Sequence, residues 1–152
     1  MKVAPTLEGG LKISVESAVD WMVLRCIPHD ARGGDLDLAD HLSSQMTGKD
    51  GEDDWREFVL PDLRDNFNAQ ISTIEDALDS FSEELEEGEI FIEKEQADFW
   101  YGGINQARIA LEERYDFSSE DPIEMPPGLR SAWFRSQFYL HVQSLLLEHV
   151  MR

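Results

Sequence analysis

The sequence predicts a mainly α-helical fold, a bundle of about five helices with a small N-terminal β-hairpin. Apolar residues recur every three or four positions over most of the chain, and clusters of glycine and proline divide these stretches. Alternation typical of strands is limited to the first 15 residues and one later run. With 152 residues and 41% hydrophobic content the chain can build one packed core, so we expect a single helical domain over residues 1–152.

The N-terminal part predicts a hairpin followed by two helices. Gly9 and Gly10 separate two short segments, the second of which alternates at Leu11, Ile13 and Val15. A helix should begin near residues 14–16 and close at Pro28 with Gly33 and Gly34. Its apolar positions at helical spacing are Val15, Val19, Met22, Val23, Cys26 and Ile27. A shorter helix is marked by Leu38, Leu42 and Met46.

The second half predicts three further helices. The longest should begin at Pro61, which suits a first helical turn, and end before Gly88. Its apolar stripe consists of Leu63, Phe67, Ile71, Ile74, Leu78, Phe81 and Leu85. Residues 89–93 are a candidate third strand beside the hairpin, and a helix follows over 93–115. The last helix, 129–151, is apolar around its circumference, so we expect it at the bundle centre with the long stripe facing both later helices.

Charge and composition exclude several classes of function. The formal net charge is -19, which repels phosphate backbones and anionic lipid, so we expect neither nucleic acid nor membrane as a partner. No signal peptide or membrane-spanning run is evident, and the lone Cys26 cannot form an internal disulfide. We therefore expect a cytoplasmic protein, and the sequence assigns no oligomeric state.

Recognisable catalytic or metal-binding motifs are absent. The chain has no nucleophile elbow, no glycine-rich phosphate loop and no HExxH sequence. The acidic stretch around Asp37 and His41 lacks the glycine and the terminal glutamate of a calcium loop. We therefore predict no catalytic residues, no metal ligands and no cofactor.

The stretch "WYGGINQAR", residues 100–108, is the candidate site. Helical geometry places Tyr101, Asn105, Arg108 and Glu112 on one stripe beside the buried face formed by Ala97, Trp100, Ile104, Ala107 and Leu111. The favoured interpretation is structural: Gly102 or Gly103 allows another helix to approach, and the polar groups hold it, with Asp62 or an acid of the same helix pairing with Arg108. The alternative is a ligand or partner site, because an arginine fork binds carboxylates.

Two segments together resemble a known family. "FVLPDLRDNF" (residues 58–67) followed by "WYGGINQARIALEERY" (residues 100–115) is similar to an uncharacterised bacterial family catalogued only as a domain of unknown function. The family hallmark, a tryptophan-led helix with Leu-Asn-Gln-Ala-Arg-Leu, corresponds here to residues 104–109. Some family genes lie beside the gene of the adaptor that delivers substrates to the Clp protease. The resemblance thus implies a role near protein quality control, and it brings no catalytic residues.

Three functions remain open from the sequence. The first is a non-catalytic helical protein acting through protein contacts, accessory to proteolysis or quality control, with a basic protein or Clp-related machinery as partner. The second is a small-molecule or metal-binding domain, or an enzyme, with a pocket around Asn105 and Arg108. The third is an acidic nucleic-acid mimic that uses residues 75–98, where eleven acidic residues face a single lysine. The first interpretation is favoured, and a merely solvated acidic face is the simplest account of that run.

Overall fold

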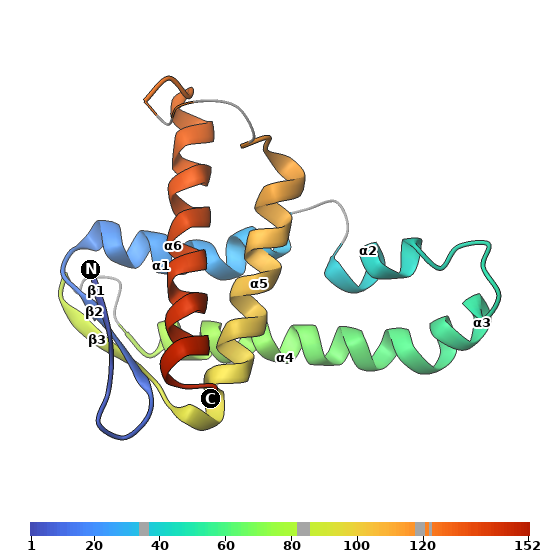
Figure 1. Ribbon diagram of the computed structural model, residues 1–152, viewed down its shortest axis with the longest axis horizontal. Coiled ribbons are helices and arrows are strands. Elements are labelled where there is room, and N and C mark those ends of the chain that lie inside the picture. The colour runs from blue at the N-terminus through green and yellow to red at the C-terminus, as the bar shows by residue number, and fades with distance from the viewer. Residues whose placement is uncertain (34–36, 82–85, 118–120, 122) are drawn as a thin grey trace.

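The computed structural model describes residues 1–33, 37–81, 86–117, 121 and 123–152. Over these residues it confirms the predicted fold class, with five helices of seven residues or more and a small antiparallel sheet (Figure 1). In chain order the elements are β1 (Lys2–Pro5), β2 (Leu11–Val15), α1 (Ala18–Arg32), α2 (Leu38–Ser44), α3 (Glu52–Asp54), the π-helix η1 (Trp55–Val59), α4 (Leu60–Asp79), β3 (Gly88–Ile92), the 3-10 helix η2 (Lys94–Gln96), α5 (Ala97–Arg114) and α6 (Pro127–His149).

The sheet has three antiparallel strands in the order β1-β2-β3. β3 is the extended run that the sequence marked as a candidate strand, and it pairs Ile90 with Ile13 and Ile92 with Leu11. These four side chains are at most 2% exposed, because alternate residues of a strand point to the same face. The apolar face thus closes one side of the core, and β1 and β2 contact α6.

α5 is the central helix of the bundle, since it packs against α1, α4 and α6. Its predicted buried face is confirmed: Ala97, Trp100, Ile104, Ala107 and Leu111 are at most 2% exposed. Burying a large apolar side chain contributes about 1.5–3 kcal/mol, so this face is a major part of the core. α5 therefore fixes where the other helices can lie.

The expectation that α6 forms the centre is wrong. Phe134, Leu140 and Leu147 on α6 are 56%, 41% and 50% exposed. An apolar circumference is compatible with a peripheral helix when apolar side chains remain uncovered, which is the case here. The expected contact of α4 with α6 is also wrong, because α4 packs on α5 and α1. α6 is in addition the longest helix, with 23 residues against 20 in α4.

The ends of α1 and α4 differ from the prediction. α1 begins after Ser17, whose side chain caps the helix, and continues through Pro28 to Arg32. η1 leads directly into α4, so Pro61 lies near a helix start that is already preceded by helical backbone. α4 ends at Asp79, earlier than predicted, and Leu85 of the predicted stripe lies outside the described residues.

α1 turns to the core a face that its apolar spacing predicted only in part, because Ile27 of the predicted stripe is buried but Val19 and Met22 are not. Trp21, Leu24 and Ile27 are at most 1% exposed, whereas Val19 and Met22 are each 65% exposed. Two apolar stripes run along this helix, and the other helices of the bundle cover only the first. The second stripe is left on the surface beside α6.

The two glycines of the "WYGGINQAR" stretch allow α4 to cross α5 closely. A Cβ atom at Gly103 would lie 2.5 Å from Cδ1 of Ile74 and 3.3 Å from the carbonyl oxygen of Gln70. At Gly102 it would meet only the end of the Gln70 side chain. At the same crossing Gln106 donates through Nε2 to the carbonyl oxygen of Phe67 at 3.1 Å and to Oε1 of Gln70 at 2.8 Å. The predicted close-packing role of the glycines is confirmed.

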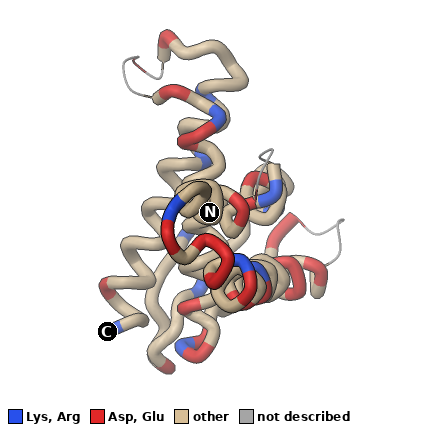
Figure 2. The backbone as a smooth tube through the Cα atoms, turned by 90° about the vertical axis from the view of Figure 1, so that its right-hand side faces the viewer, with Lys and Arg blue, Asp and Glu red and all other residues tan. Residues whose placement is uncertain are grey.

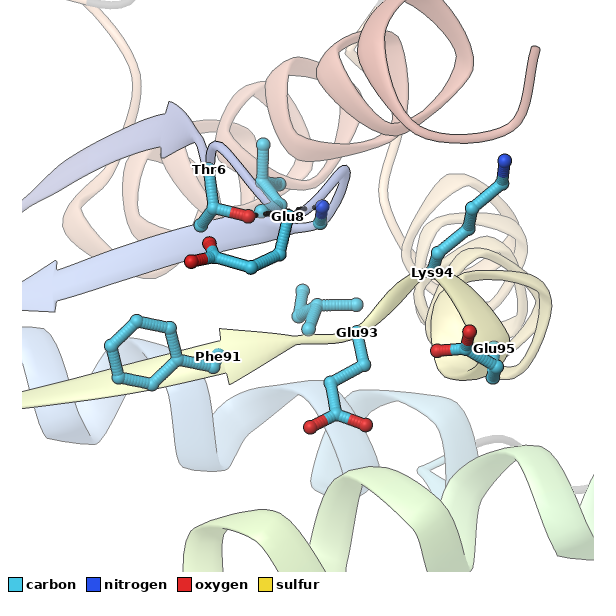
Figure 3. A pocket seen from close by; sticks show the side chains of 9 residues that line it. Thr6, Glu8, Phe91, Glu93, Lys94 and Glu95 are labelled. Carbon is cyan, nitrogen blue, oxygen red and sulfur yellow. Dashed lines mark hydrogen bonds between the residues drawn. The ribbon is translucent and has the colours of Figure 1, made fainter.

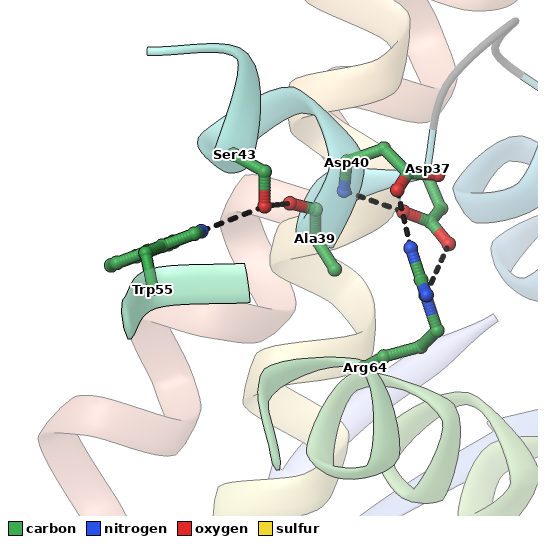
Figure 4. A network of polar contacts seen from close by, with 6 residues as sticks. All are labelled: Asp37, Ala39, Asp40, Ser43, Trp55 and Arg64. Atoms are coloured by element: carbon green, nitrogen blue, oxygen red, sulfur yellow. Dashed lines mark hydrogen bonds and ion pairs between the residues drawn. The ribbon is translucent and has the colours of Figure 1, made fainter. Parts of the chain in front are cut away.

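Residues 37–64 form an arm that projects from the bundle (Figure 1). α2 packs on α4, and polar contacts hold the arm together (Figure 4). Arg64 forms ion pairs with Asp37 and Asp40, and the indole Nε1 of Trp55 donates to Oγ of Ser43 at 2.8 Å. Figure 2, which looks at the molecule from the side of the arm, shows more acidic than basic positions along the chain.

The α4–α5 crossing makes a stability prediction. Gly103→Leu places a branched side chain against Ile74 and the α4 backbone, so we expect the free energy of unfolding to fall by about 1–3 kcal/mol or more. Gly128→Leu is the matched control, because a Cβ atom there meets nothing within 4 Å. Urea denaturation measures both. Equal stability of the two variants would contradict the close crossing.

Candidate functional site

The polar stripe of α5 meets one side chain of α6, the buried amide of Gln143, which is 2% exposed. The Nε2 atom of Gln143 donates to Oδ1 of Asn105 and to the carbonyl oxygen of Tyr101, each at 3.4 Å. Its Oε1 atom accepts a hydrogen bond of 2.7 Å from Nη1 of Arg108. The structure therefore brings Tyr101, Asn105 and Arg108 together around a residue that the sequence analysis missed. The only available signal was a glutamine within the apolar run of the last helix.

Arg108 pairs with an acidic residue of its own helix, which was one of the two partners expected from the sequence. Its Nη2 atom lies 3.5 Å from Oε1 of Glu112, a side chain that is 54% exposed. The expectation that Asp62 pairs with Arg108 is wrong, because Asp62 lies in the first turn of α4 at the arm, whereas Arg108 bonds Gln143 on α6. Exposed ion pairs of this kind contribute about 0–1 kcal/mol, so the hydrogen bond to Gln143 is the stronger tie. The stripe therefore joins α5 to α6, with Glu112 at its solvent edge.

The acidic run of residues 75–98 is divided among several elements. Glu75 on α4 forms an ion pair of 2.7 Å with Arg32, and Glu89 on β3 lies 3.7 Å from Lys12. Residues 82–85, which include two of its glutamates, lie outside the described residues. Two of the described carboxylates of the run thus form ion pairs with basic side chains on other elements.

A hollow of about 490 Å³ lies where the hairpin turn meets β3 and η2 (Figure 3). Glu8, Glu93 and Glu95 line it, but Figure 3 shows that their carboxylates point in different directions. Thr6 Oγ1 accepts from the backbone nitrogen of Gly10 at 3.0 Å and so serves the turn itself. These side chains do not converge on a common ligand position.

A groove of about 590 Å³ lies between α1 and α6, which we call the α1/α6 groove. Most of its lining is apolar: Met1, Val19, Met22, Val23, Cys26, Pro127, Phe134 and Phe138. Arg130, Ser131 and Arg135 complete it, and no aspartate or glutamate is among the lining residues. The exposed second stripe of α1 is one wall of this groove, and Phe134, 56% exposed, lies on the other.

A buried ion pair bridges α1 and α6 next to the groove. Asp30 on α1 is 2% exposed, and the Arg135 guanidinium binds it with both Nε (2.8 Å to Oδ2) and Nη2 (3.2 Å to Oδ1). Tyr139 donates its hydroxyl hydrogen to Oδ2 at 2.6 Å. A carboxylate this deeply buried is stable only with such partners, so the network sets the spacing of the two helices. Its members are 105 and 109 residues apart in sequence, and the sequence analysis did not identify them.

Burial and the neighbouring charge of Asp30 determine the protonation of this network. Burial, with Asp30 second, raises the pKa of the Tyr139 phenol well above its ordinary value of 10. Burial likewise raises the pKa of the half-buried Cys26 thiol. A thiol held in its neutral form is a poor nucleophile. The groove therefore offers an apolar contact surface, and Cys26 contributes to it as a small apolar side chain.

The described part of the chain offers neither a metal cluster nor a membrane-spanning helix. No three or more His, Cys, Asp or Glu side chains gather closely enough among these residues to hold a metal ion. No helix among them is both long and apolar enough to cross a membrane.

The Asp30 network predicts a specific pH dependence. The phenol of Tyr139 stays protonated in the native state, whereas it ionises near pH 10 in the unfolded state. The contribution of its hydrogen bond with Asp30 to the free energy of unfolding is therefore complete below pH 10 and is lost as pH rises above it. At pH 8, Tyr139→Phe should lower the free energy of unfolding by about 1.5–3 kcal/mol, since a hydrogen bond to a charged group is removed. The difference between wild type and variant should then shrink by about 1.4 kcal/mol per pH unit above pH 10. Denaturant titrations between pH 8 and 11 measure it, and a constant difference would contradict the assignment.

Comparison with known proteins gives one match. No curated protein and no solved structure shows significant similarity to the chain. A family described as "Domain of unknown function (DUF2017)" matches residues 7–149, which include the α1/α6 groove apart from Met1 and the whole polar stripe of α5. The chain therefore belongs to this family of domains of unknown function.

Proposed function

We propose that this protein is non-catalytic and acts through protein contacts, with the α1/α6 groove as its binding surface. The observation that carries this proposal is the exposure of three large apolar side chains around one groove: Val19 and Met22 at 65% and Phe134 at 56%. Single exposed apolar residues are ordinary, whereas several gathered on one hollow are typical of contact surfaces.

The composition of the groove defines the chemistry of its partner. Its lining contains no acidic residue, although the chain as a whole has a net charge of -19. Of its two arginines, Arg135 is paired with the buried Asp30, and Arg130 donates to the carbonyl oxygens of Ile123 and Met125. A protein segment with apolar side chains flanked by carboxylates meets apolar surface here, and no acidic lining residue repels its carboxylates. At this surface we therefore propose an apolar partner segment that tolerates flanking carboxylates, in place of the basic partner expected from the net charge.

The magnitude of the contact favours reversible binding. Covering Val19, Met22 and Phe134 contributes at most about 1.5–3 kcal/mol for each side chain. Association itself costs about 4–15 kcal/mol in lost freedom of motion, so the partner must add apolar surface of its own. We infer a contact that forms and dissociates, in the setting that the resemblance implied: a bacterial cytoplasm, accessory to proteolysis or quality control.

The polar stripe of α5 does not support a second function. Gln143 accepts from Nη1 of Arg108 and donates to Asn105, so these groups are engaged with the same chain, and Nε of Arg108, which has no hydrogen-bond partner, is buried out of reach of a ligand. A ligand at this position would have to displace a side chain that is 2% exposed.

Photo-crosslinking tests the proposal. The photoreactive amino acid p-benzoylphenylalanine replaces Met22 in the full chain, expressed in its own cells, and the crosslinked peptide is identified by mass spectrometry. The control carries it at Phe91, which is 55% exposed on β3 and does not line the groove. We expect a discrete product from position 22 that maps to an apolar segment flanked by aspartate or glutamate and is lost in Phe134→Asp.

Three results would contradict the proposal. They are the absence of a product at position 22, the same products from positions 22 and 91, or a crosslinked peptide that is basic or wholly polar. Phe134→Asp should fold normally, because its side chain is more than half exposed, and a thermal melt verifies this.

A further inference from the structure

The arm carries a second exposed apolar patch. Phe58 is 64% exposed and Val59 is 38% exposed, and both lie on the π-helix η1. Of the same π-helix, it is Trp55 that binds Ser43 of α2, whereas the side chains of Phe58 and Val59 stay exposed. The arm therefore exposes two adjacent apolar residues at a distance from the groove.

Carboxylates surround the patch on the arm. Asp54, Glu57 and Asp62 are exposed, and none of them forms an ion pair with a described residue. The arginine of this segment, Arg56, forms an ion pair with Glu52, with 3.3 Å between Nε and Oε1. Phe58 and Val59 with these acids match the chemistry that the groove demands, an apolar segment flanked by negative charge.

The arm cannot fill the groove of its own chain. In Figure 1 it extends to the right of the bundle, whereas the first half of α1, which carries Val19 and Met22, lies at the left. α4 runs without a break from the arm into the core, and Nε2 of His41 lies 2.9 Å from Oε1 of Glu113 on α5, so the arm is held in this direction. Any arm that reaches the groove therefore comes from another molecule.

We propose that the occupant of the α1/α6 groove is the arm of a second copy of this chain, with Phe58 and Val59 lying against Val19, Met22 and Phe134. This inference rests on the proposed function, since it names the partner of the same groove. Each chain offers one arm and one groove, so two copies can exchange arms reciprocally and bury both patches of each chain. Because the groove lining holds no acidic residue, Asp54, Glu57 and Asp62 of the arm meet no like charge among the lining residues.

Sedimentation velocity of the purified full chain tests the proposal. Concentrations between about 5 and 200 μM detect a dimer whose dissociation constant is in the micromolar range. We expect dimers to increase with concentration in the wild type. Phe58→Asp removes the arm contact and Met22→Asp removes the groove contact, and each variant alone should be monomeric. Phe91→Asp, a substitution at an exposed side chain outside both patches, should associate like the wild type.

Mixing the two variants is the decisive step. The Phe58→Asp chain keeps an intact groove and the Met22→Asp chain keeps an intact arm, so the equimolar mixture should form a heterodimer through one contact. A chain with both substitutions should not associate with either variant. If a substitution disturbs folding in a thermal melt, Val59→Asp and Val19→Asp replace the two variants.

Several outcomes would overturn the inference. They are a monomeric wild type at 200 μM, dimers that persist in either variant, or a mixture that stays monomeric while the wild type associates. Dimers that persist in Phe58→Asp would indicate contact of groove with groove, and dimers that persist in Met22→Asp would indicate contact of arm with arm. A monomeric chain whose groove still crosslinks to another acidic and apolar protein would remove this inference alone, whereas absence of both results would remove the proposed function as well.

Discussion

The close crossing of α4 and α5 at Gly102 and Gly103 is the constraint on which the rest of the structure depends. With no Cβ atom at Gly103, the backbone of α4 at Gln70 comes near enough for Gln106 to bond across the crossing. α4 is thereby held against the core by its second half, where Ile71, Ile74 and Leu78 are buried. Its first half extends past the bundle and carries the arm, so the glycines on α5 also determine where Phe58 is presented.

The opposite side of α5 determines where α6 lies and hence where the groove opens. Gln143 joins α6 to Tyr101, Asn105 and Arg108, and the Asp30–Arg135 pair joins it to α1. Replacing a buried ion pair by apolar residues is often neutral for stability, so its main effect here is to fix one spacing of α1 and α6. That spacing leaves one apolar stripe of α1 uncovered, and the surface we assign to protein contacts follows from it.

The periodic part of the fold could be predicted from the sequence, but the pairing of its faces could not. Trp100, Ile104 and Leu111 are buried as predicted because α5 has one dominant apolar stripe. α1 has two such stripes, and only its contacts with α5 and α4 decide that Leu24 is buried and Met22 exposed.

For the candidate site, the sequence identified Asn105 and Arg108 as polar groups that border the core, and it predicted that they tie the helix admitted by the two glycines or a nearby loop. In the structure the glycines admit α4, whereas Asn105 and Arg108 bond α6. The sequence could not identify Gln143 as the partner of these two side chains, nor Asp30 as the partner of Arg135 and Tyr139. These contacts join residues 35 to 109 positions apart and leave no local pattern. Nor could it find the groove, whose walls read as ordinary core positions until the neighbouring helices are placed.

A double-mutant cycle on Arg108 and Gln143 tests the central claim most directly, namely that the polar stripe of α5 is an internal tie and the binding surface lies elsewhere. The free energy of unfolding is measured by urea denaturation for Arg108→Ala, Gln143→Ala, the double variant and the wild type. Because the two side chains share a hydrogen bond of 2.7 Å in a largely buried setting, the account predicts a coupling energy of about 0.5–3 kcal/mol. Additive effects within about 0.3 kcal/mol, with the thermal transition of Arg108→Ala unchanged, would contradict it and return the stripe to the role of a binding site.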